Sequence, residues 1–274
     1  MTFSDYAALL LVCVSFFVCV RVVRFVKLVE KLSPSRKLSK RKPDIDFDAT
    51  EISASEAKEM IIQLSDWVRK QNADYLMGVH FSGLMLSSKI ALDTGFDLQK
   101  LTYSENRKDR LDPPKIFSAS DKKMSGRVCI LDDISRQGLT LRQVANEIFS
   151  DFQRGRNQVR ETCYGVLMLV ETPSKSQTGF FLPDTFLHSI SNENVVFPWT
   201  SLVERTRQAY REEQDGKEVS NPAALQDYKE MITNPEFAAF CIELAVDEPK
   251  AYEGCLASSF FDLYRIRNKK NDAA

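Results

Sequence analysis

Two adjacent carboxylates, Asp132 and Asp133, follow a run of apolar residues in the segment GRVCILDDISRQGLTLRQV, residues 126–144. The apolar run predicts a buried strand, and the pattern behind the polar turn predicts a helix. In an open α/β sheet, ligands bind beyond the carboxyl ends of the strands, so we expect both acids to lie at that edge. Carboxylates placed there can accept hydrogen bonds from the vicinal hydroxyls of a sugar.

The turn between this strand and the following helix has the features of a phosphate cradle. Residues 135–140 lead into the helix, whose first backbone N–H groups and positive dipole end favour an anion. Gly138 permits a tight backbone in this turn, and Thr140 adds a hydroxyl near the helix start. Two acids beside such a cradle predict a sugar-phosphate site. The alternative is that Asp132 caps the turn and Asp133 faces solvent.

The acid pair belongs to a chain in which strands and helices alternate. Strand patterns cover residues 74–81, 96–104, 127–133 and 161–171, and further apolar segments lie at 184–190 and 194–200. Helical patterns cover residues 48–71, 84–95 and 140–153, and most of residues 203–270. Alternation of this kind favours a parallel α/β sheet. Polar residues predict a long loop at 106–127 and a short loop at Ser82 and Gly83.

The first 29 residues predict a membrane anchor. Residues 6–20 carry no charge, and three basic residues then recur at every third position, where their long stems can snorkel. No small-residue cleavage site follows, which favours an uncleaved anchor over a signal peptide. Residues 21–42 hold nine basic residues and one acid, so this flank is expected in the cytoplasm. The alternative is an apolar helix that packs on the folded domain or on a partner.

Composition excludes several other classes of function. The 274 residues carry a formal charge of −1, which gives no overall electrostatic basis for binding nucleic acid. The six cysteines show no metal-binding spacing and are expected to be reduced and structural. With only two histidines, a zinc site held by the protein is not expected.

The segment VCILDDISRQGLTL, residues 128–141, resembles the motif with which type I phosphoribosyltransferases bind phosphoribosyl pyrophosphate (PRPP). Both contain four apolar residues, two acids and a loop that ends in Gly-x-Thr. The segment MGVHFSGLML, residues 77–86, stands where the family has its pyrophosphate loop, and residues 106–127 stand where it has a flexible hood. Residues 164–202 are similar in order and spacing to the hypoxanthine/guanine/xanthine branch. The resemblance covers about residues 50–205.

This resemblance implies a parallel sheet flanked by helices, a PRPP or nucleotide ligand, and Mg²⁺ bound together with PRPP. Asp132 and Asp133 are the implied catalytic residues, which hold the ribose or, through Mg-PRPP, its metal. The implied substrate-binding residues are Arg136, Gln137, Gly138, Leu139, Thr140, His80, Phe81, Ser82, Gly83, Glu171, Phe197 and Trp199. For Phe197 and Trp199, stacking on a base and packing in the core are equally compatible with the sequence. For His80, a structural role is the alternative to phosphate binding.

Several departures from the family pattern fall on functional positions. Phe81 stands where many members have a basic residue. Arg136 replaces the aspartate proposed as the general base, and a guanidinium cannot take up a proton at neutral pH. Glu171 is an acceptor where the purine branch has a lysine donor, and Gln137 and Leu139 replace small residues of the PRPP loop. Transfer of phosphoribosyl with release of pyrophosphate is therefore one hypothesis. A nucleotide-sensing module and an effector that attacks nucleotides are the alternatives.

The chain is predicted to have four parts. A transmembrane anchor at residues 1–29 and a basic linker at residues 30–47 precede a phosphoribosyltransferase-like domain at 48–205 and a helical C-terminal extension at 206–274. The sequence predicts a single-pass membrane protein whose N-terminus lies outside and whose folded domain is cytoplasmic. The expected partners are PRPP or a nucleotide and the membrane. A homodimer is left open.

Overall fold

The structure, a computed structural model, describes residues 49–98, 101–105, 115–118, 124–135, 138–155, 157–170, 183–190 and 194–271. The predicted anchor and linker, as well as Arg136, Gln137 and Glu171, lie outside the described residues. Within the described ranges, no helix is long and apolar enough to cross a membrane. Residues 47–274 form one compact unit.

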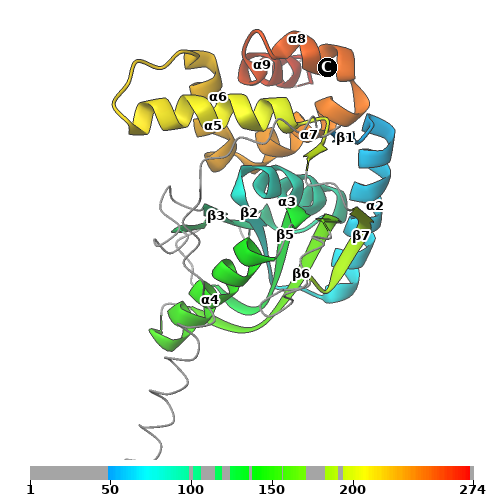
Figure 1. The fold of residues 1–274 in the computed structure, drawn as a ribbon, viewed down its shortest axis with the longest axis vertical. Coiled ribbons are helices and arrows are strands. Elements are labelled where there is room, and N and C mark those ends of the chain that lie inside the picture. The colour runs from blue at the N-terminus through cyan, green and yellow to red at the C-terminus, as the bar shows by residue number, and fades with distance from the viewer. Residues whose placement is uncertain are drawn as a thin grey trace, which may run out of the picture. The chain divides into compact units, whose positions relative to one another are not determined.

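A six-stranded sheet lies at the centre of this unit, in the order β4-β3-β2-β5-β6-β7 (Figure 1). The strands are β2 (Tyr75–Val79), β3 (Leu101–Glu105), β4 (Lys115–Ser118), β5 (Ser125–Ser135), β6 (Gln158–Val170) and β7 (Thr185–Ile190). All neighbouring strands are parallel except β4, which runs antiparallel to β3 at the edge. The predicted α/β class with a parallel sheet is therefore confirmed.

The prediction of one long loop over residues 106–127 is wrong, because part of this segment pairs with the sheet. β4 lies within it, and β5 already begins at Ser125. Pairing with β4 satisfies the outer backbone groups of β3, which would otherwise form an open sheet edge.

Helices cover both faces of the sheet (Figure 1). α4 (Leu139–Gln153) lies on one face, and α2 (Ala54–Gln71) and α3 (His80–Thr94) lie on the other. Alternate side chains of β5 point to opposite faces of the sheet, as expected for a strand. Ile130 belongs to the core cluster under α4, whereas Cys129 and Leu131 belong to the cluster under α2 and α3.

Local sequence signals explain where α2 and α3 begin or end. α2 begins at Ala54, later than the predicted start at residue 48, because Ser53 and Glu56 form a capping box. The residues before it form β1 (Thr50–Glu51), which pairs in parallel with β8 (Val195–Val196). The predicted end of α3 is confirmed, since Gly95 adopts a left-handed φ of 68° and its N–H bonds back to the last turn.

Within the described region, five helices follow the sheet. They are α5 (Thr200–Gln214), α6 (Pro222–Thr233), α7 (Pro235–Asp247), α8 (Pro249–Cys255) and α9 (Phe260–Asn271). α7 packs on α3, and its buried side chains join the core cluster that also contains those of α3. The predicted helical character of residues 203–270 is therefore confirmed. These helices share one apolar core with the face of the sheet that α3 covers.

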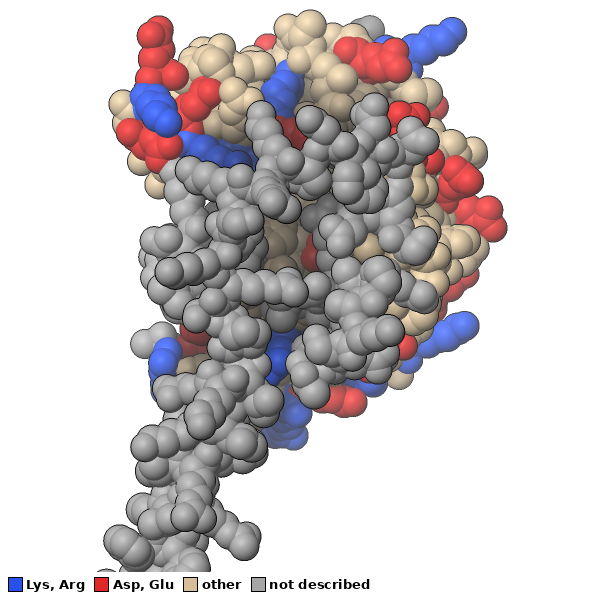
Figure 2. All heavy atoms as spheres, in the orientation of Figure 1, with Lys and Arg blue, Asp and Glu red and all other residues tan. Residues whose placement is uncertain are grey.

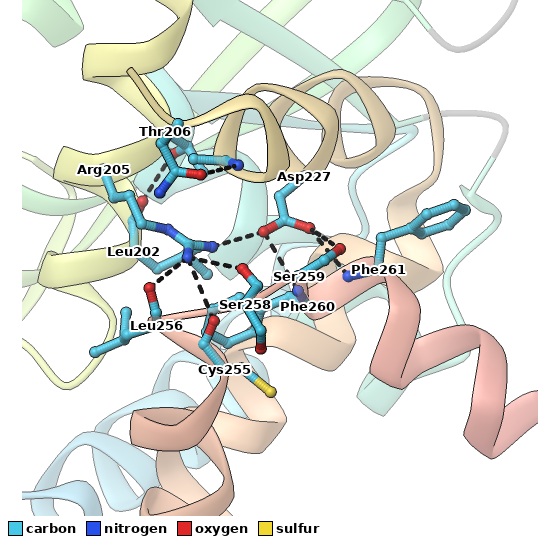
Figure 3. A network of polar contacts seen from close by, with 12 residues as sticks. Leu202, Arg205, Thr206, Asp227, Cys255, Leu256, Ser258, Ser259, Phe260 and Phe261 are labelled. Atoms are coloured by element: carbon cyan, nitrogen blue, oxygen red, sulfur yellow. Dashed lines mark hydrogen bonds and ion pairs between the residues drawn. The ribbon is translucent and has the colours of Figure 1, made fainter. Parts of the chain in front are cut away.

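A buried ion pair joins the C-terminal helices (Figure 3). The Arg205 guanidinium of α5 donates to Asp227 Oδ2 of α6 at 2.6 Å and to the carbonyl of Leu256 at 2.6 Å. Asp227 in turn accepts the backbone N–H groups of Phe260 and Phe261 at the start of α9, at 3.3 and 3.0 Å. The pair thus links three helices through one carboxylate.

Charges of both signs are interspersed on the described surface of the face drawn in Figure 2. In this view, the described part of the face carries no continuous band of Lys and Arg side chains.

Candidate functional site

β2 and β5 are neighbours at the point where the winding of the sheet reverses. From β2 the chain passes through α3 to β3 on one side, whereas β5, β6 and β7 follow on the other. Gly78 of β2 is in register with Leu131 of β5, so the start of α3 and the acid pair leave the sheet side by side. Open α/β sheets bind ligands in the crevice at such a switch point. The candidate site therefore lies at the carboxyl end of β5.

The Asp133 carboxylate is buried and has partners from two other elements. Its Oδ1 accepts a hydrogen bond from Ser82 Oγ of α3 at 3.0 Å, and its Oδ2 accepts one from Trp199 Nε1 at 3.3 Å. Asp133 is 9% exposed, so the alternative in which it faces solvent does not hold. Asp133, Ser82 and Trp199 are all predicted site residues, and they meet on the side of β5 that α3 covers.

Asp132 occupies a different environment from Asp133. Strand alternation directs Asp132 to the face that carries α4, and its Oδ1 accepts the backbone N–H of Asp133 at 3.0 Å. It is 4% exposed. Burial raises the pKa of the Asp132 carboxyl well above its usual range, and the charge of Asp133 raises it further. We therefore expect Asp132 to hold a proton at a pH where an exposed aspartate has lost it. β5 also continues past both acids to Ser135, two residues beyond the predicted end.

The start of α4 lies on the same side as Asp132. The preceding Gly138 has a left-handed φ of 65°, which a glycine adopts without steric cost. Among the described residues, no side chain caps this helix, and Thr140 lies partly buried in its first turn. The backbone of Leu139 begins the helix directly, so the first N–H groups of α4 are placed as an anion site requires.

The predicted loop after β2 is wrong, because α3 begins at His80 immediately after Val79. Two glycines explain this direct passage from strand to helix. A Cβ at Gly83 would lie 2.7 Å from the carbonyl oxygen of Leu131, and a Cβ at Gly78 would lie 2.5 Å from the carbonyl oxygen of Gly83. The first turn of α3 therefore packs directly on the strands. No loop is present at this place to wrap a pyrophosphate.

His80 and Phe81 are neighbours in the sequence but lie in different surroundings. Phe81 is buried and stacks on Tyr228 of α6 with ring centroids 5.0 Å apart, so it is a core residue rather than a ligand residue. His80 is partly buried and has a left-handed φ of 56°, which is uncommon for a residue other than glycine. Burial lowers the pKa of His80 to about 4, and the positive charge of Arg207 contributes to this shift. The imidazole is therefore neutral at physiological pH.

Phe197 and Trp199 lie in the core, which supports the packing alternative for both. They are 1% and 0% exposed, and their rings stack on each other with centroids 4.8 Å apart. Trp199 also donates its indole N–H to Asp133, which ties the start of α5 to the end of β5. Neither ring offers an open face to a base in this structure.

Two further residues affect the site: the sequence placed Ser135 only at the start of the turn, and it gave Arg207 no role. Ser135, at the end of β5, is 3% exposed, and its hydroxyl has no hydrogen-bond partner in the described structure. Arg207, on α5, carries a positive charge that lowers the pKa of both Asp132 and His80. Arg207 lies outside the segment of the family resemblance. The only sequence signal was its position one turn after the buried Val203.

Comparison with known proteins finds likeness in structure only. Neither a protein-family model nor a curated protein sequence matches the chain. A purine phosphoribosyltransferase from Pyrococcus horikoshii matches with 22% identity and a TM-score of 0.43, over 55% of this chain and 92% of that chain. The xanthine-guanine-hypoxanthine phosphoribosyltransferase of Helicobacter pylori matches with 15% identity and a TM-score of 0.41, over 58% and 97% of the two chains. Orotate phosphoribosyltransferase from Aeropyrum pernix matches with 17% identity and a TM-score of 0.36, over 50% and 72%.

All three are phosphoribosyltransferases. They belong to the family that the PRPP-like motif of this sequence resembles. Because the identities and TM-scores are low, the function of this chain is argued from the geometry of its site.

The described residues do not fit a magnesium ion held by the protein itself. Both oxygens of Asp133 have protein partners, and Asp132 is a buried acid with a raised pKa. Among the described residues, no group of three His, Cys, Asp or Glu side chains could hold a metal. Magnesium would therefore reach this site only as a part of the PRPP ligand.

Proposed function

We propose that the phosphoribosyltransferase-like domain, residues 48–205, binds a 5′-phosphorylated ribose, either in PRPP or in a nucleotide. One observation carries the proposal: a buried acid and a helix start that no described side chain caps lie together at the carboxyl end of β5, next to the switch point of the sheet. Both face the side that α4 covers. This combination suits a ligand that has hydroxyls at one end and an anion at the other.

The 5′-phosphate would bind at the start of α4. The left-handed Gly138 leaves the first N–H groups of the helix free of a side-chain cap among the described residues. These groups and the positive end of the helix dipole stabilise a phosphate without a counter-charge from a side chain. The Thr140 hydroxyl, in the same turn, is a further donor.

The ribose hydroxyls would meet Asp132. A protonated carboxyl has one donor and further acceptor positions, so it can serve a hydroxyl pair in which one member donates and the other accepts. Asp133 supports this arrangement from the other side of β5, since its bonds to Ser82 and Trp199 hold the strand end in place.

Binding without transfer is the function that the geometry supports best. α3 begins without the predicted pyrophosphate loop, and Phe81 is in the core. Both features favour a PRPP- or nucleotide-sensing module. Phosphoribosyl transfer is the second candidate: an acceptor would form a bond to ribose C1 while the bond from C1 to pyrophosphate breaks and pyrophosphate leaves with the electron pair. The positive charge of Arg207 near the switch point favours this candidate.

Calorimetric titration of the full chain in detergent tests the proposal, with ribose 5-phosphate, nucleoside monophosphates and PRPP with Mg²⁺ as ligands. We expect binding of at least one 5′-phosphorylated ribose and an Asp132→Ala variant about tenfold weaker, since that change removes one buried hydrogen-bonding group. Glu59→Gln, an exposed acid on α2, is the control. Absence of binding, or equal affinities in the two variants, would contradict the proposal. Release of pyrophosphate with a nucleophile present would identify a transferase.

We also propose that residues 1–29 hold the domain at the cytoplasmic side of a membrane. The uncharged run and its basic flank support this. We expect the full chain to sediment with membranes after a carbonate wash and to be released by detergent. Release by carbonate alone would contradict an integral anchor.

A further inference from the structure

The outer side of α4 exposes two phenylalanines. Phe149 and Phe152 are 61% and 45% exposed, and Phe149 is the most exposed large apolar side chain among the described residues. The opposite side of the helix packs on the sheet through Val144 and Ile148. Because Phe149 and Phe152 lie three positions apart, they are neighbours on the helix surface and form one apolar patch. A patch of this kind marks a candidate interaction surface.

The exposed charges of α4 are both positive. Arg142, in its first turn, and Arg154, at its C-terminal end, are exposed, and among the described residues neither side chain has a hydrogen bond or an ion pair. The two acids of the helix, Glu147 and Asp151, are only partly exposed. Residues 152–160, at the end of the helix and the start of β6, contain three arginines and no acid. The patch is therefore flanked by positive charge, which fits an anionic partner.

The patch lies at the edge of the sheet opposite the acid pair. α4 leads from the carboxyl end of β5 to the start of β6, which is parallel to β5 (Figure 1). At that start, the N–H of Gln158 donates to the carbonyl of Met124, directly before β5, at 2.7 Å. Phe149 and Phe152, in the last turns of α4, are thus near the amino ends of the strands. A partner bound here leaves the crevice at the carboxyl ends open to a ligand.

We propose that the C-terminal half of α4 docks on the surface of an anionic bilayer, with Phe149 and Phe152 between the lipid headgroups and Arg154 beside their phosphates. Aromatic rings enter the boundary between headgroups and acyl chains, and an arginine extends its apolar stem there while its charge stays with the phosphates. The cytoplasmic leaflet carries anionic lipids, so the sign of the charge fits the side on which the domain is proposed to lie. The inference rests on the proposed anchor and is independent of the proposed ribose site.

The linker between the proposed anchor and the folded unit is long enough for this contact. Residues 30–47 span at most about 60 Å when fully extended. A unit of the size of residues 47–274 has a diameter of about 45 Å. The linker can therefore reach any side of the unit, so surface chemistry decides which side meets the bilayer. Among the described helices, α4 alone has two exposed large apolar side chains.

Two tryptophan reporters test the docking. Phe149→Trp places one in the patch, and Ile62→Trp places the other at an exposed apolar position of α2, on the other face of the sheet. Each full-length variant is reconstituted into phosphatidylcholine vesicles that contain phosphatidylserine and brominated lipid, and the quenching of Trp67 and Trp199 in the wild type is subtracted. We expect Phe149→Trp to be quenched at least about twofold more than Ile62→Trp, because a docked helix buries its apolar side about 5–10 Å into the interface.

Charge reversal tests the role of the arginines. In the Phe149→Trp chain, Arg154→Glu should lower the ratio of docked to undocked protein about fivefold or more, since one basic residue near an anionic leaflet contributes about that factor. Arg211→Glu, exposed on α5, is the matched control and should leave the quenching unchanged. Omission of phosphatidylserine should lower the quenching as Arg154→Glu does.

Equal quenching of the two reporters would refute docking by α4. Quenching that persists with Arg154→Glu and on neutral vesicles would refute the anionic surface. A blue shift of Phe149→Trp in detergent that grows with protein concentration would show that a second copy covers the patch, which also overturns the inference. If the wild-type chain does not float with vesicles, the proposed anchor fails and this inference with it, whereas the ribose titration is unaffected. Phe152→Trp is the second reporter if thermal unfolding shows that the first variant is not folded.

Discussion

At the scale of single residues, the site is built from polar groups that burial leaves in unusual states. Asp132 is a buried acid with a raised pKa, Ser135 has a buried hydroxyl without a partner in the described structure, and His80 is a neutral imidazole. Each state costs stability in the free protein. Groups of this kind cluster at binding sites, because a bound ligand can supply the hydrogen-bond partners that buried groups lack.

The raised pKa of Asp132 makes stability depend on pH. The folded state holds this proton to a higher pH than the unfolded state does, so the free energy of unfolding falls as pH rises above about 4, the ordinary range of aspartate. Asp132→Asn removes the titration. We expect the variant to gain stability relative to wild type between pH 5 and pH 8, by at most about 1.4 kcal/mol per pH unit. Urea unfolding at both pH values measures the difference, and a constant difference would contradict burial of this acid.

Ser135→Ala separates a ligand role from a structural one. Since the hydroxyl has no partner in the described structure, its removal should leave the free energy of unfolding unchanged or raise it by up to about 1 kcal/mol. If the hydroxyl contacts the 5′-phosphorylated ribose, the affinity for that ligand should fall about fivefold, since one hydrogen bond is lost. Chemical denaturation measures the free energy of unfolding, and calorimetry measures the affinity. A variant that loses stability and keeps its affinity would show that the hydroxyl serves the fold.

At the scale of elements, the close packing of α3 on the strands decides what kind of site is possible. Because Gly78 and Gly83 have no side chains, the helix packs directly against the sheet at these two positions. As a result Ser82, in the first turn, reaches Asp133 of β5. Because α3 follows β2 directly, the start of a helix stands where a loop was predicted.

Gly83→Ala tests this packing. The added Cβ would lie 2.7 Å from the Leu131 carbonyl oxygen, and backbone cannot move as a flexible side chain can. We expect a loss of about 1–3 kcal/mol in the free energy of unfolding, the usual cost of overpacking. Gly254→Ala is the matched control: it lies in α8 with no atom within 4 Å of the added Cβ, so a gain of up to about 1 kcal/mol is expected. Equal effects of the two changes would contradict the close approach of α3.

At the scale of the whole folded unit, the C-terminal helices belong to the same apolar core as α3 and reach the crevice through α5. The Arg205–Asp227 pair holds α5, α6 and the start of α9 together. The position of α5, whose start contacts Asp133 through Trp199, therefore depends on a contact remote from the acid pair. Whether two such units associate stays a prediction, which light scattering would test.

Asp227→Ala should destabilise the whole unit. The change leaves Arg205 as a buried charge without its carboxylate and removes the acceptor for the α9 start, so we expect a loss of about 3–5 kcal/mol. Lys229→Ala breaks the exposed pair with Glu213, which joins the same two helices α5 and α6, and should cost about 1 kcal/mol or less. Urea unfolding compares the two. Similar losses would contradict the central place of the buried pair.

By itself, the sequence determined the alternation of strands and helices and the succession of β5, Gly138 and α4. These features depend on hydrophobic periodicity and on glycine in a turn, which residues a few positions apart encode. The capping box at Ser53 was also present in the sequence, although the helical periodicity alone placed the start of α2 too early.

Only the tertiary structure decided which of the candidate residues meet. Ser82 and Trp199 reach Asp133 from 51 and 66 residues away, and no local pattern records such contacts. In the same way, Phe81 packs in the core against Tyr228 of α6, and Tyr228 stacks in turn on Tyr210 of α5. Burial and charge pairing depend on packing between distant segments, and packing is a property of the folded chain.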